Sequence, residues 1–297
     1  MNKIQETRTP NLFFIGVQKA GTTLWYEYLK KHPDIFLPEN KEPQFFTKDE
    51  LFKQGVDKYR EFYSNAKDES YVGDFSPEYI FRPNAINRIK SLIEEDAKFI
   101  VSLRQPVQRA YSQFNMMVNR GFYMNSFDED LYLDEHQPDM PEYKNALRPA
   151  YLVARGMYFN QLKRLIEAFG NENVKVIIFE EWVNNPEFYY KDILEFLGLG
   201  YYPLELGEKV GKNQTFLYQN NNNLIKFLRS INKNLQETQF SKSIFFNKFK
   251  EFVKIRIGRS PEKLDRVKVN QLTNSIFLED IKKTENLLGR ELSIWYK

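Results

Sequence analysis

The sequence predicts an α/β fold with a central parallel sheet flanked by helices, built as a single domain over residues 1–297. Short apolar runs that suit buried strands alternate with segments of helical periodicity through the first two thirds of the chain. Parallel strands need long crossover connections, and helices usually provide them. Because no internal repeat and no clean linker interrupts the chain, we expect one domain rather than two.

The individual elements follow from local patterns. Residues 11–17 (NLFFIGV) are apolar almost throughout, as in a strand buried on both faces. Further strands are predicted at 71–75, 98–103 and 174–179. Proline at a helix start, glycine at a helix end and apolar residues at helical spacing predict the helices. These helices cover 22–31, 83–97, 106–119, 158–169, 186–197 and 274–288.

Two long segments lack a clear pattern. Residues 121–150 are rich in Asp, Pro, Met and Tyr and predict a long loop, which in a compact domain is more often a lid or binding loop than a connector. Residues 224–297 predict a mostly helical C-terminal part. Its Lys- and Phe-rich stretch, 226–259, is interpreted as a solvated pair of helices, with an amphipathic face toward lipid or an acidic partner as the alternative.

Composition excludes several functional classes. There is no cysteine, so disulfides, thiolate metal sites and a cysteine nucleophile are excluded. Two histidines, His32 and His136, are too few for a multi-histidine centre, and we predict no metal. The 43 basic and 40 acidic residues do not indicate a nucleic-acid partner. A polar start and the lack of a run of about 20 apolar residues predict a cytoplasmic protein without an integral membrane segment.

A glycine-containing turn follows the first predicted strand and reads GVQKAGTT, from Gly16 to Thr23. A strand, such a turn and a helix start together direct backbone N–H groups at one point, where the helix dipole also favours an anion. The spacing Gly16-x-x-x-x-Gly21 is that of the triphosphate-binding loop, but Thr22 stands where that loop has its lysine. Lys19 lies inside the turn instead, which favours a ligand with one phosphate and one sulfate.

The turn resembles a motif of a known enzyme family. KAGTT, which comprises Lys19, Ala20, Gly21, Thr22 and Thr23, resembles the 5′-phosphosulfate-binding motif of sulfotransferases that use 3′-phosphoadenosine 5′-phosphosulfate (PAPS). RQPVQRAYS resembles their 3′-phosphate motif, in which Arg104 and Ser112 bind the 3′-phosphate, the arginine through a charge-assisted fork. The resemblance continues through 155–170, 179–199 and 287–297, and it is greatest to the bacterial and glycan-modifying branches.

This resemblance implies a fold related to the P-loop nucleotide kinases, PAPS as sulfuryl donor and 3′-phosphoadenosine 5′-phosphate (PAP) as product. It also implies that Lys19 stabilises charge on the leaving phosphate. Glu42, in ENKEPQFF, matches a glutamate that acts as general base in the glycan-modifying branch. Lys212, in KVGKNQ, matches a loop that closes over the cofactor.

The acceptor side is predicted from the same resemblance. Asp74 matches an acidic residue of the acceptor site, although the lysine that follows it in the family is Phe75 here. The loop 121–150 is expected on this side, so His136 is an alternative base. Other candidates to line the site are Phe45, Tyr79 and Tyr123, with Phe46 and Phe81 beside them in sequence; for each aromatic residue, core packing is the alternative.

The sequence also supports alternative interpretations of some motifs. VIIFEE, residues 176–181, imitates the strand and carboxylate that hold magnesium in a nucleotide kinase or ATPase, and a non-catalytic nucleotide-binding protein is a second alternative. The helix-ending His32 is interpreted as a capping or packing residue, and Trp25 as core. The acceptor (a glycan, a lipid or sterol, or a small natural product) and the oligomeric state are not predicted.

Overall fold

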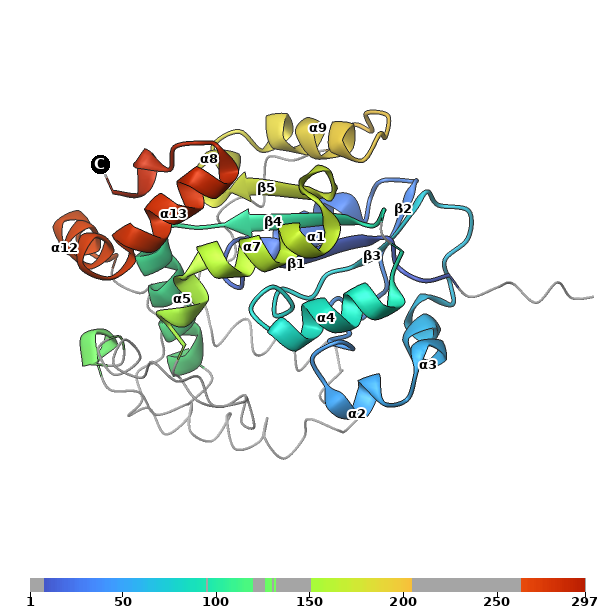
Figure 1. Cartoon of the computed structure of the whole chain (residues 1–297). Helices are drawn as coiled ribbons and strands as arrows, with labels where there is room; N and C mark the ends of the chain where they lie inside the picture. The colour runs from blue at the N-terminus through green and yellow to red at the C-terminus, as the bar shows by residue number, and fades with distance from the viewer. Residues whose placement is uncertain are drawn as a thin grey trace, which may run out of the picture.

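A parallel sheet of five strands forms the centre of the computed structural model, which describes residues 8–94, 96–119, 126–129, 131, 151–204 and 263–296 (Figure 1). The strand order is β2-β3-β1-β4-β5, and each neighbouring pair is parallel. The strands are β1 (Leu12–Gly16), β2 (Ile35–Phe36), β3 (Tyr71–Asp74), β4 (Lys98–Leu103) and β5 (Val174–Ile178). The parallel sheet predicted from the alternating pattern is confirmed.

The sheet is buried on both faces, which explains its continuous apolar strands. β1 lies in the middle, and Leu12, Phe13, Phe14 and Ile15 are fully buried although successive side chains point to opposite faces. Because all strands run in one direction, their carboxyl ends meet at one edge of the sheet. The turns that follow β1 and β4 therefore lie next to each other, where ligands of open α/β sheets usually bind.

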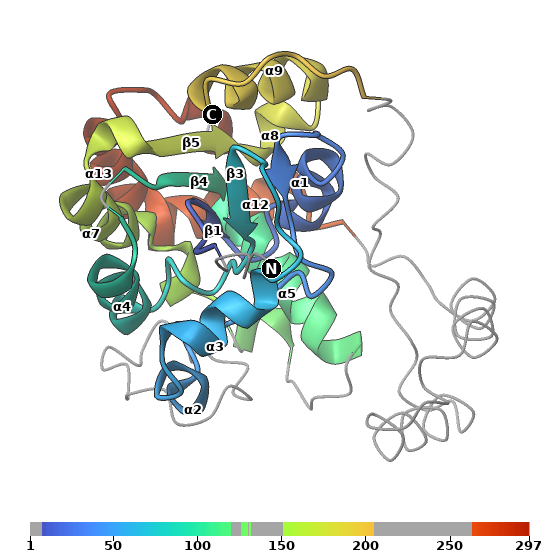
Figure 2. The same ribbon diagram turned by 90° about the vertical axis from the view of Figure 1, so that its right-hand side faces the viewer.

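Helices cover the two faces of the sheet (Figures 1 and 2). One face carries α1, α8 and α9, which pack in one apolar cluster around Trp25, Trp182 and Ile193. The other carries α4, α7 and α13, which pack in a second cluster with Ile86 and Leu162. Their bounds are α1 (Thr22–Leu29), α4 (Pro83–Leu92), α7 (Tyr158–Phe169), α8 (Phe179–Trp182), α9 (Pro186–Phe196) and α13 (Leu278–Leu288).

The remaining helices lie at the margins of this arrangement. They are α2 (Asp49–Phe52), α3 (Val56–Arg60), α5 (Pro106–Asn119) and α12 (Arg266–Leu272). α5 begins at the carboxyl edge of the sheet, directly after β4 (Figure 1). Pro106 is its first residue, a position where the missing N–H of proline has no intrahelical partner to lose.

Two predicted helix bounds are wrong. The helix expected over 83–97 ends at Leu92, because Ile93 adopts an extended backbone and leads toward β4. The helix expected over 274–288 begins earlier, with α12, and continues through a π-helical turn (Thr273–Phe277) into α13. β2, α2 and α3 were not predicted; each has five residues or fewer, which is too short to show a periodic pattern.

Some predicted features lie outside the described residues. They are most of the loop 121–150, the stretch 226–259, and the site candidates Tyr123, His136 and Lys212. In residues 263–296, the described part of the expected helical C-terminal region, most residues are helical.

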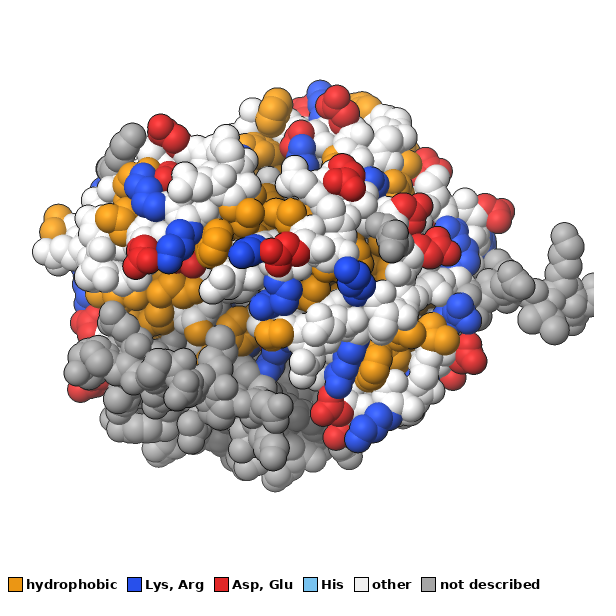
Figure 3. Space-filling model, in the orientation of Figure 1, with side chains coloured by type: hydrophobic (Ala, Val, Ile, Leu, Met, Phe, Trp, Pro, Cys, Tyr) orange, Lys and Arg blue, Asp and Glu red, His pale blue; other side chains and the backbone are white. Residues whose placement is uncertain are grey.

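The described surface carries charges of both signs. On the face in Figure 3, lysine and arginine side chains are interspersed with aspartate and glutamate. None of the helices in the described ranges combines the length and the apolar character that a membrane-crossing helix needs.

Candidate active site

The turn between β1 and α1 has the geometry of an anion-binding loop. Gly21 is the N-cap residue of α1; its backbone is in the left-handed conformation, with φ 81°, and it has no side chain that could cap the helix. The first N–H groups of α1, those of Thr22 and Thr23, therefore lack an intrahelical acceptor and are available to an anion. A Cβ at residue 21 would lie 2.2 Å from Trp182, so this position requires glycine for space as well as for conformation.

Buried polar contacts fix this loop to the sheet. The Trp182 indole N–H donates to Ser102 Oγ over 3.0 Å, and the Ser102 hydroxyl donates to the Ala20 carbonyl over 2.8 Å. The Val17 N–H donates to the Ser102 carbonyl. Lys19, between these anchors, has φ 75°, an uncommon conformation for a residue with a side chain. Sequence reasoning missed Ser102 and Trp182, which belong to distant strands and helices.

Arg104 lies directly after β4 and contacts the same loop. Its Nη1 donates to the Lys19 carbonyl over 2.9 Å, and its guanidinium carbon lies 4.5 Å from the centre of the Phe179 ring. Burial lowers the pKa of the Arg104 guanidinium, and its Nε has no hydrogen-bond partner among the described residues. The nearby Glu180 carboxylate opposes this shift of the Arg104 pKa. A cation in this setting is well suited to an anionic ligand.

The start of α5 follows Arg104 at once. Gln105 caps this helix, since its Oε1 accepts the Gln108 N–H over 2.7 Å. Its amide Nε2 donates to the buried Thr273 hydroxyl in the π-helical turn, which links the cap to the C-terminal helices. Ser112 lies at the end of the second turn of α5 and is half-buried. The predicted arrangement of an arginine at a strand end and a serine on the next helix is present.

Lys41 connects the segment that carries Glu42 to the start of α1. The Lys41 ammonium donates to Thr23 Oγ1 over 2.9 Å and lies 3.6 Å from Glu42 Oε1. The Glu42 side chain is 37% exposed and that of Lys41 is 18% exposed. Burial lowers the pKa of Lys41, although the Glu42 carboxylate opposes the shift. Sequence reasoning did not select Lys41; its place directly before the candidate base was the available signal.

The segment that carries Glu42 is anchored on both sides. Before it, the Tyr26 hydroxyl donates to the Pro38 carbonyl over 2.7 Å. After it, Phe45 and Phe46 are fully buried and pack on the Tyr59 ring, at 4.6 and 4.9 Å between centroids. Lys41 and Glu42 thus project from a short stretch with fixed ends.

Asp74 and the hydroxyl groups that bind it form a buried layer behind this segment. Its carboxylate accepts hydrogen bonds from the hydroxyls of Ser76, Tyr59 and Tyr79 at 2.6, 2.8 and 3.0 Å. Burial raises the pKa of Asp74 to about 6, although the hydroxyl donors act in the opposite direction. Ser76 Oγ also accepts the Gln44 N–H over 3.4 Å, which connects this layer to the Glu42 segment. Asp74 and Tyr79, like Phe45, have no exposed surface, so here they support the site from behind.

A second carboxylate lies beside the anion-binding loop. Glu78 Oε1 accepts from Gln18 Nε2 over 3.3 Å, and Glu78 Oε2 lies 2.9 Å from the Arg155 guanidinium. Arg155 in turn lies 4.4 Å from the Phe81 ring centre. Glu78, Gln18 and Arg155 were not predicted. Glu78 thus links the anion-binding loop, through Gln18, to Arg155.

Comparison with known proteins decides the family. The model of the sulfotransferase domain matches residues 9–267. The chain belongs to the sulfotransferase domain family. The crystal structure of a sulfotransferase from Alicyclobacillus acidocaldarius matches with a TM-score of 0.67 and 25% identity, over 98% of this chain and 100% of that chain. The P-loop-like sulfotransferase fold expected from the sequence motifs is thereby confirmed.

Two curated relatives match shorter regions. The membrane-associated sulfotransferase kil1 of Dictyostelium discoideum is 34% identical over 112 residues, which are 37% of this chain and 23% of that protein. Human heparan sulfate glucosamine 3-O-sulfotransferase 3B1 is 26% identical over 200 residues, 64% of this chain and 46% of that protein. The match therefore spans less than half the length of either relative.

The carboxylates that suggested a magnesium site have other partners in this sulfotransferase domain. Glu180 accepts the Gln105 N–H over 3.0 Å and the Trp295 indole N–H over 2.9 Å. Glu181 lies 2.7 Å from the Arg290 guanidinium. Both side chains thus join the β5–α8 turn to neighbouring segments. These contacts, like the family, do not support the kinase alternative.

Two other predictions concerned packing and are confirmed. Trp25 is fully buried, and its ring lies 5.3 Å from that of Trp182. His32 is 3% exposed; its Nε2 lies 3.0 Å from the Gly200 carbonyl, and its Nδ1 accepts the Asp34 N–H over 3.2 Å. His32 therefore holds the turn after α1 in place.

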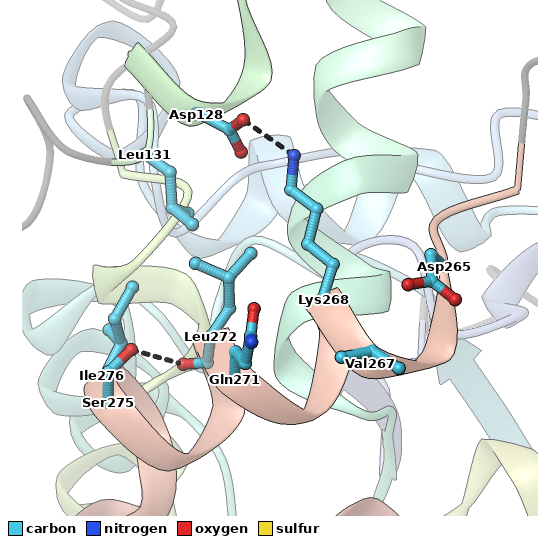
Figure 4. Close-up of a pocket in the computed structure, with 9 residues that line it drawn as sticks. All are labelled: Asp128, Leu131, Asp265, Val267, Lys268, Gln271, Leu272, Ser275 and Ile276. Carbon is cyan, nitrogen blue, oxygen red and sulfur yellow. Dashed lines mark hydrogen bonds and ion pairs between the residues drawn. The ribbon is translucent and has the colours of Figure 1, made fainter.

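A separate pocket of about 560 Å³ lies along α12 (Figure 4). An ion pair of 2.6 Å between Lys268 and Asp128 crosses its upper part in this view. Its lining includes Leu131, Leu272 and Ile276, but none of the predicted donor or acceptor residues. We therefore do not place the reaction there.

Proposed function

We propose that this protein transfers the sulfuryl group of PAPS to an acceptor hydroxyl and releases PAP. The observation that carries the proposal is the contact between the Arg104 guanidinium and the Lys19 carbonyl, 2.9 Å apart. It joins two anion-binding elements that follow different strands, β1 and β4. PAPS has anionic groups at both its 5′ and 3′ positions, and such a ligand fits this pair better than a linear triphosphate does.

The donor is assigned to residues of both elements. Lys19, Ala20, Gly21, Thr22 and Thr23 hold the 5′-phosphosulfate, through the lysine and the N–H groups at the start of α1. Arg104 and Ser112 hold the 3′-phosphate. Lys212, which lies outside the described residues, is assigned to the donor from the sequence resemblance alone.

The transfer is an in-line displacement. An acceptor oxygen attacks sulfur, the new S–O bond forms, and the bond from sulfur to the bridging oxygen breaks with its electron pair passing to the 5′-phosphate of PAP. Lys19 stabilises that developing negative charge. Glu42 takes the hydroxyl proton, a role supported by its partly exposed carboxylate near the start of α1.

The acceptor belongs to the class of hydroxyl-bearing glycans, lipids or small natural products. Relatives named for heparan sulfate favour a glycan, whereas Phe75 removes the lysine that follows the acidic residue in that branch. Asp74, Phe45 and Tyr79 form the layer behind the acceptor side. Tyr123 and His136, which lie outside the described residues, are assigned to the acceptor from the sequence resemblance alone. The protein is expected in the cytoplasm.

The test compares Glu42→Gln with Glu39→Gln, a matched control because Glu39 lies three residues away with its side chain 94% exposed. Transfer of label from [³⁵S]PAPS is measured on a panel of oligosaccharides, phenols and sterols, together with PAP affinity. We expect Glu42→Gln to lower turnover by about 10²–10⁴-fold with PAP affinity unchanged, and Glu39→Gln to resemble wild type. Wild-type protein that transfers no label from PAPS contradicts the function; full turnover in Glu42→Gln contradicts the base.

A further inference from the structure

Lys41 is a partly buried cation at the meeting point of the donor loop and the candidate base. Its ammonium contacts Thr23 Oγ1 at 2.9 Å and lies 3.6 Å from Glu42 Oε1. The ammonium has been drawn out of water, since only 18% of the side chain is exposed. Lys30, at the other end of α1, differs: its side chain is 35% exposed and it pairs with the exposed Glu39.

The position of Thr23 gives this contact a chemical meaning. In the spacing Gly16-x-x-x-x-Gly21, Thr23 occupies the place of the serine or threonine whose hydroxyl binds Mg²⁺ in triphosphate-binding loops. That metal ion bridges the group being transferred and the leaving phosphate, and it neutralises charge that develops between them. In this chain an ammonium, supplied by another segment, contacts the corresponding hydroxyl.

We propose that Lys41 is a catalytic residue whose ammonium binds the non-bridging oxygens of the sulfuryl group, in the place where a triphosphate loop holds its metal ion. This inference rests on the proposed function. In the transfer step, the acceptor oxygen bonds to sulfur, the bridging bond breaks toward the 5′-phosphate, and the hydroxyl proton passes to Glu42. Lys41 stays protonated throughout and offsets the charge on the sulfuryl oxygens.

The arrangement also accounts for Phe75. A cation at the sulfuryl group is not available from the position after Asp74, because that side chain is a buried phenylalanine packed on Phe14 at 5.0 Å. Lys41 supplies a cation from the segment that carries the base. Because Phe45 and Phe46 anchor this segment, the cation and the base are positioned together.

The test is the affinity for PAPS relative to PAP, since the two ligands differ only in the sulfuryl group. Isothermal titration at low temperature is performed on wild type, Lys41→Met and the matched control Lys30→Met. We expect Lys41→Met to bind PAPS about 10–100-fold more weakly with PAP affinity within about twofold of wild type. Lys30→Met retains both affinities. Equal weakening of PAPS and PAP, or no change in either, overturns the inference.

A charge-preserving variant separates this role from a structural one. Lys41→Arg is expected to keep most of the preference for PAPS, whereas a merely structural lysine gives no difference between the two ligands in any variant. If Lys41→Met does not fold, as judged by thermal unfolding, Lys41→Gln and Lys41→Arg give the same comparison. Wild type that binds neither PAPS nor PAP contradicts the proposed function itself, whereas wild type that binds both and an unaffected Lys41→Met contradict only the role of Lys41.

Discussion

The two segments that meet at the start of α1 are held in different ways. The loop after β1 is fixed through its backbone, by Ser102 and Arg104, and by close packing on Trp182. The segment with Lys41 and Glu42 is anchored at its two ends and contacts α1 through the Lys41 side chain, and its charged side chains are partly exposed. The loop after β1 is therefore part of the sheet's own packing, whereas the candidate base, Glu42, belongs to a segment whose charged side chains lie outside that packing.

The first test removes the positive charge of Lys19 from the loop after β1. Lys19→Ala is expected to lower kcat/KM for sulfuryl transfer by about 10²–10³-fold, because the charge on the leaving phosphate loses its stabilising cation. Circular dichroism and urea unfolding should show an intact fold, since the loop is anchored by the flanking backbone contacts. Lys90→Ala, on the exposed side of α4, is the control. Activity of Lys19→Ala within tenfold of wild type refutes the role of Lys19.

A second test addresses the other end of the donor. Arg104→Lys keeps a positive charge but loses the planar fork, so PAP affinity should fall by about 10–100-fold while AMP affinity changes little. Arg60→Lys serves as control, because the Arg60 guanidinium bonds to Thr9 and Asp57, neither of which is a candidate donor-binding residue. The readout is the ratio of PAP to AMP affinity by titration. A ratio unchanged in Arg104→Lys shows that the 3′-phosphate binds elsewhere.

A third test separates backbone conformation from close packing. Gly21 and Gly289 both adopt left-handed conformations, but only Gly21 has a neighbour, Trp182, where a Cβ would lie. Both alanine variants should lose stability in urea unfolding, and Gly21→Ala should lose roughly 1–3 kcal/mol more than Gly289→Ala because of overpacking. Similar losses in the two variants would mean that Trp182 does not constrain the loop.

The smallest expected effect concerns Asp74. Its pKa is raised from 3.8 to about 6 by burial, so between these pH values the folded protein binds more protons than the unfolded chain. The free energy of unfolding should therefore decrease as pH rises from about 4 to about 6, by on the order of 1–3 kcal/mol. In Asp74→Asn this contribution should disappear. Urea unfolding across this pH range measures it, and an unchanged slope in the variant contradicts the assignment.

The sequence predicted the elements that carry long patterns. Four strands and the helices of eight residues or more were predicted, because a buried strand shows a continuous apolar run and Pro106 marks the start of α5. The two-residue β2 and the π-helical turn at Thr273 were missed. The first is too short to show alternation, and the second is an irregularity inside a helical pattern.

The candidate site was predictable where it is local in sequence. Lys19 and Arg104 each belong to a short motif, and the structure brings these motifs together at one edge of the sheet. Lys41, Ser102 and Trp182 were missed, because each acts through a contact with a residue distant along the chain. The buried Asp74 carboxylate accepts hydrogen bonds from the hydroxyls of Tyr59 and Tyr79. The spacing of these three residues in the sequence does not indicate that they meet.

We propose that the loop at Lys19 and the arginine after β4 bind the two ends of one adenine nucleotide with phosphate at its 3′ position. Thermal unfolding in the presence of PAP, compared with ATP plus Mg²⁺, tests it most directly, because a ligand of the native state raises the melting temperature. We predict a clear increase with PAP and little or none with ATP plus Mg²⁺. Stabilisation by ATP plus Mg²⁺ without stabilisation by PAP would show that this site binds a triphosphate rather than a 3′-phosphorylated nucleotide.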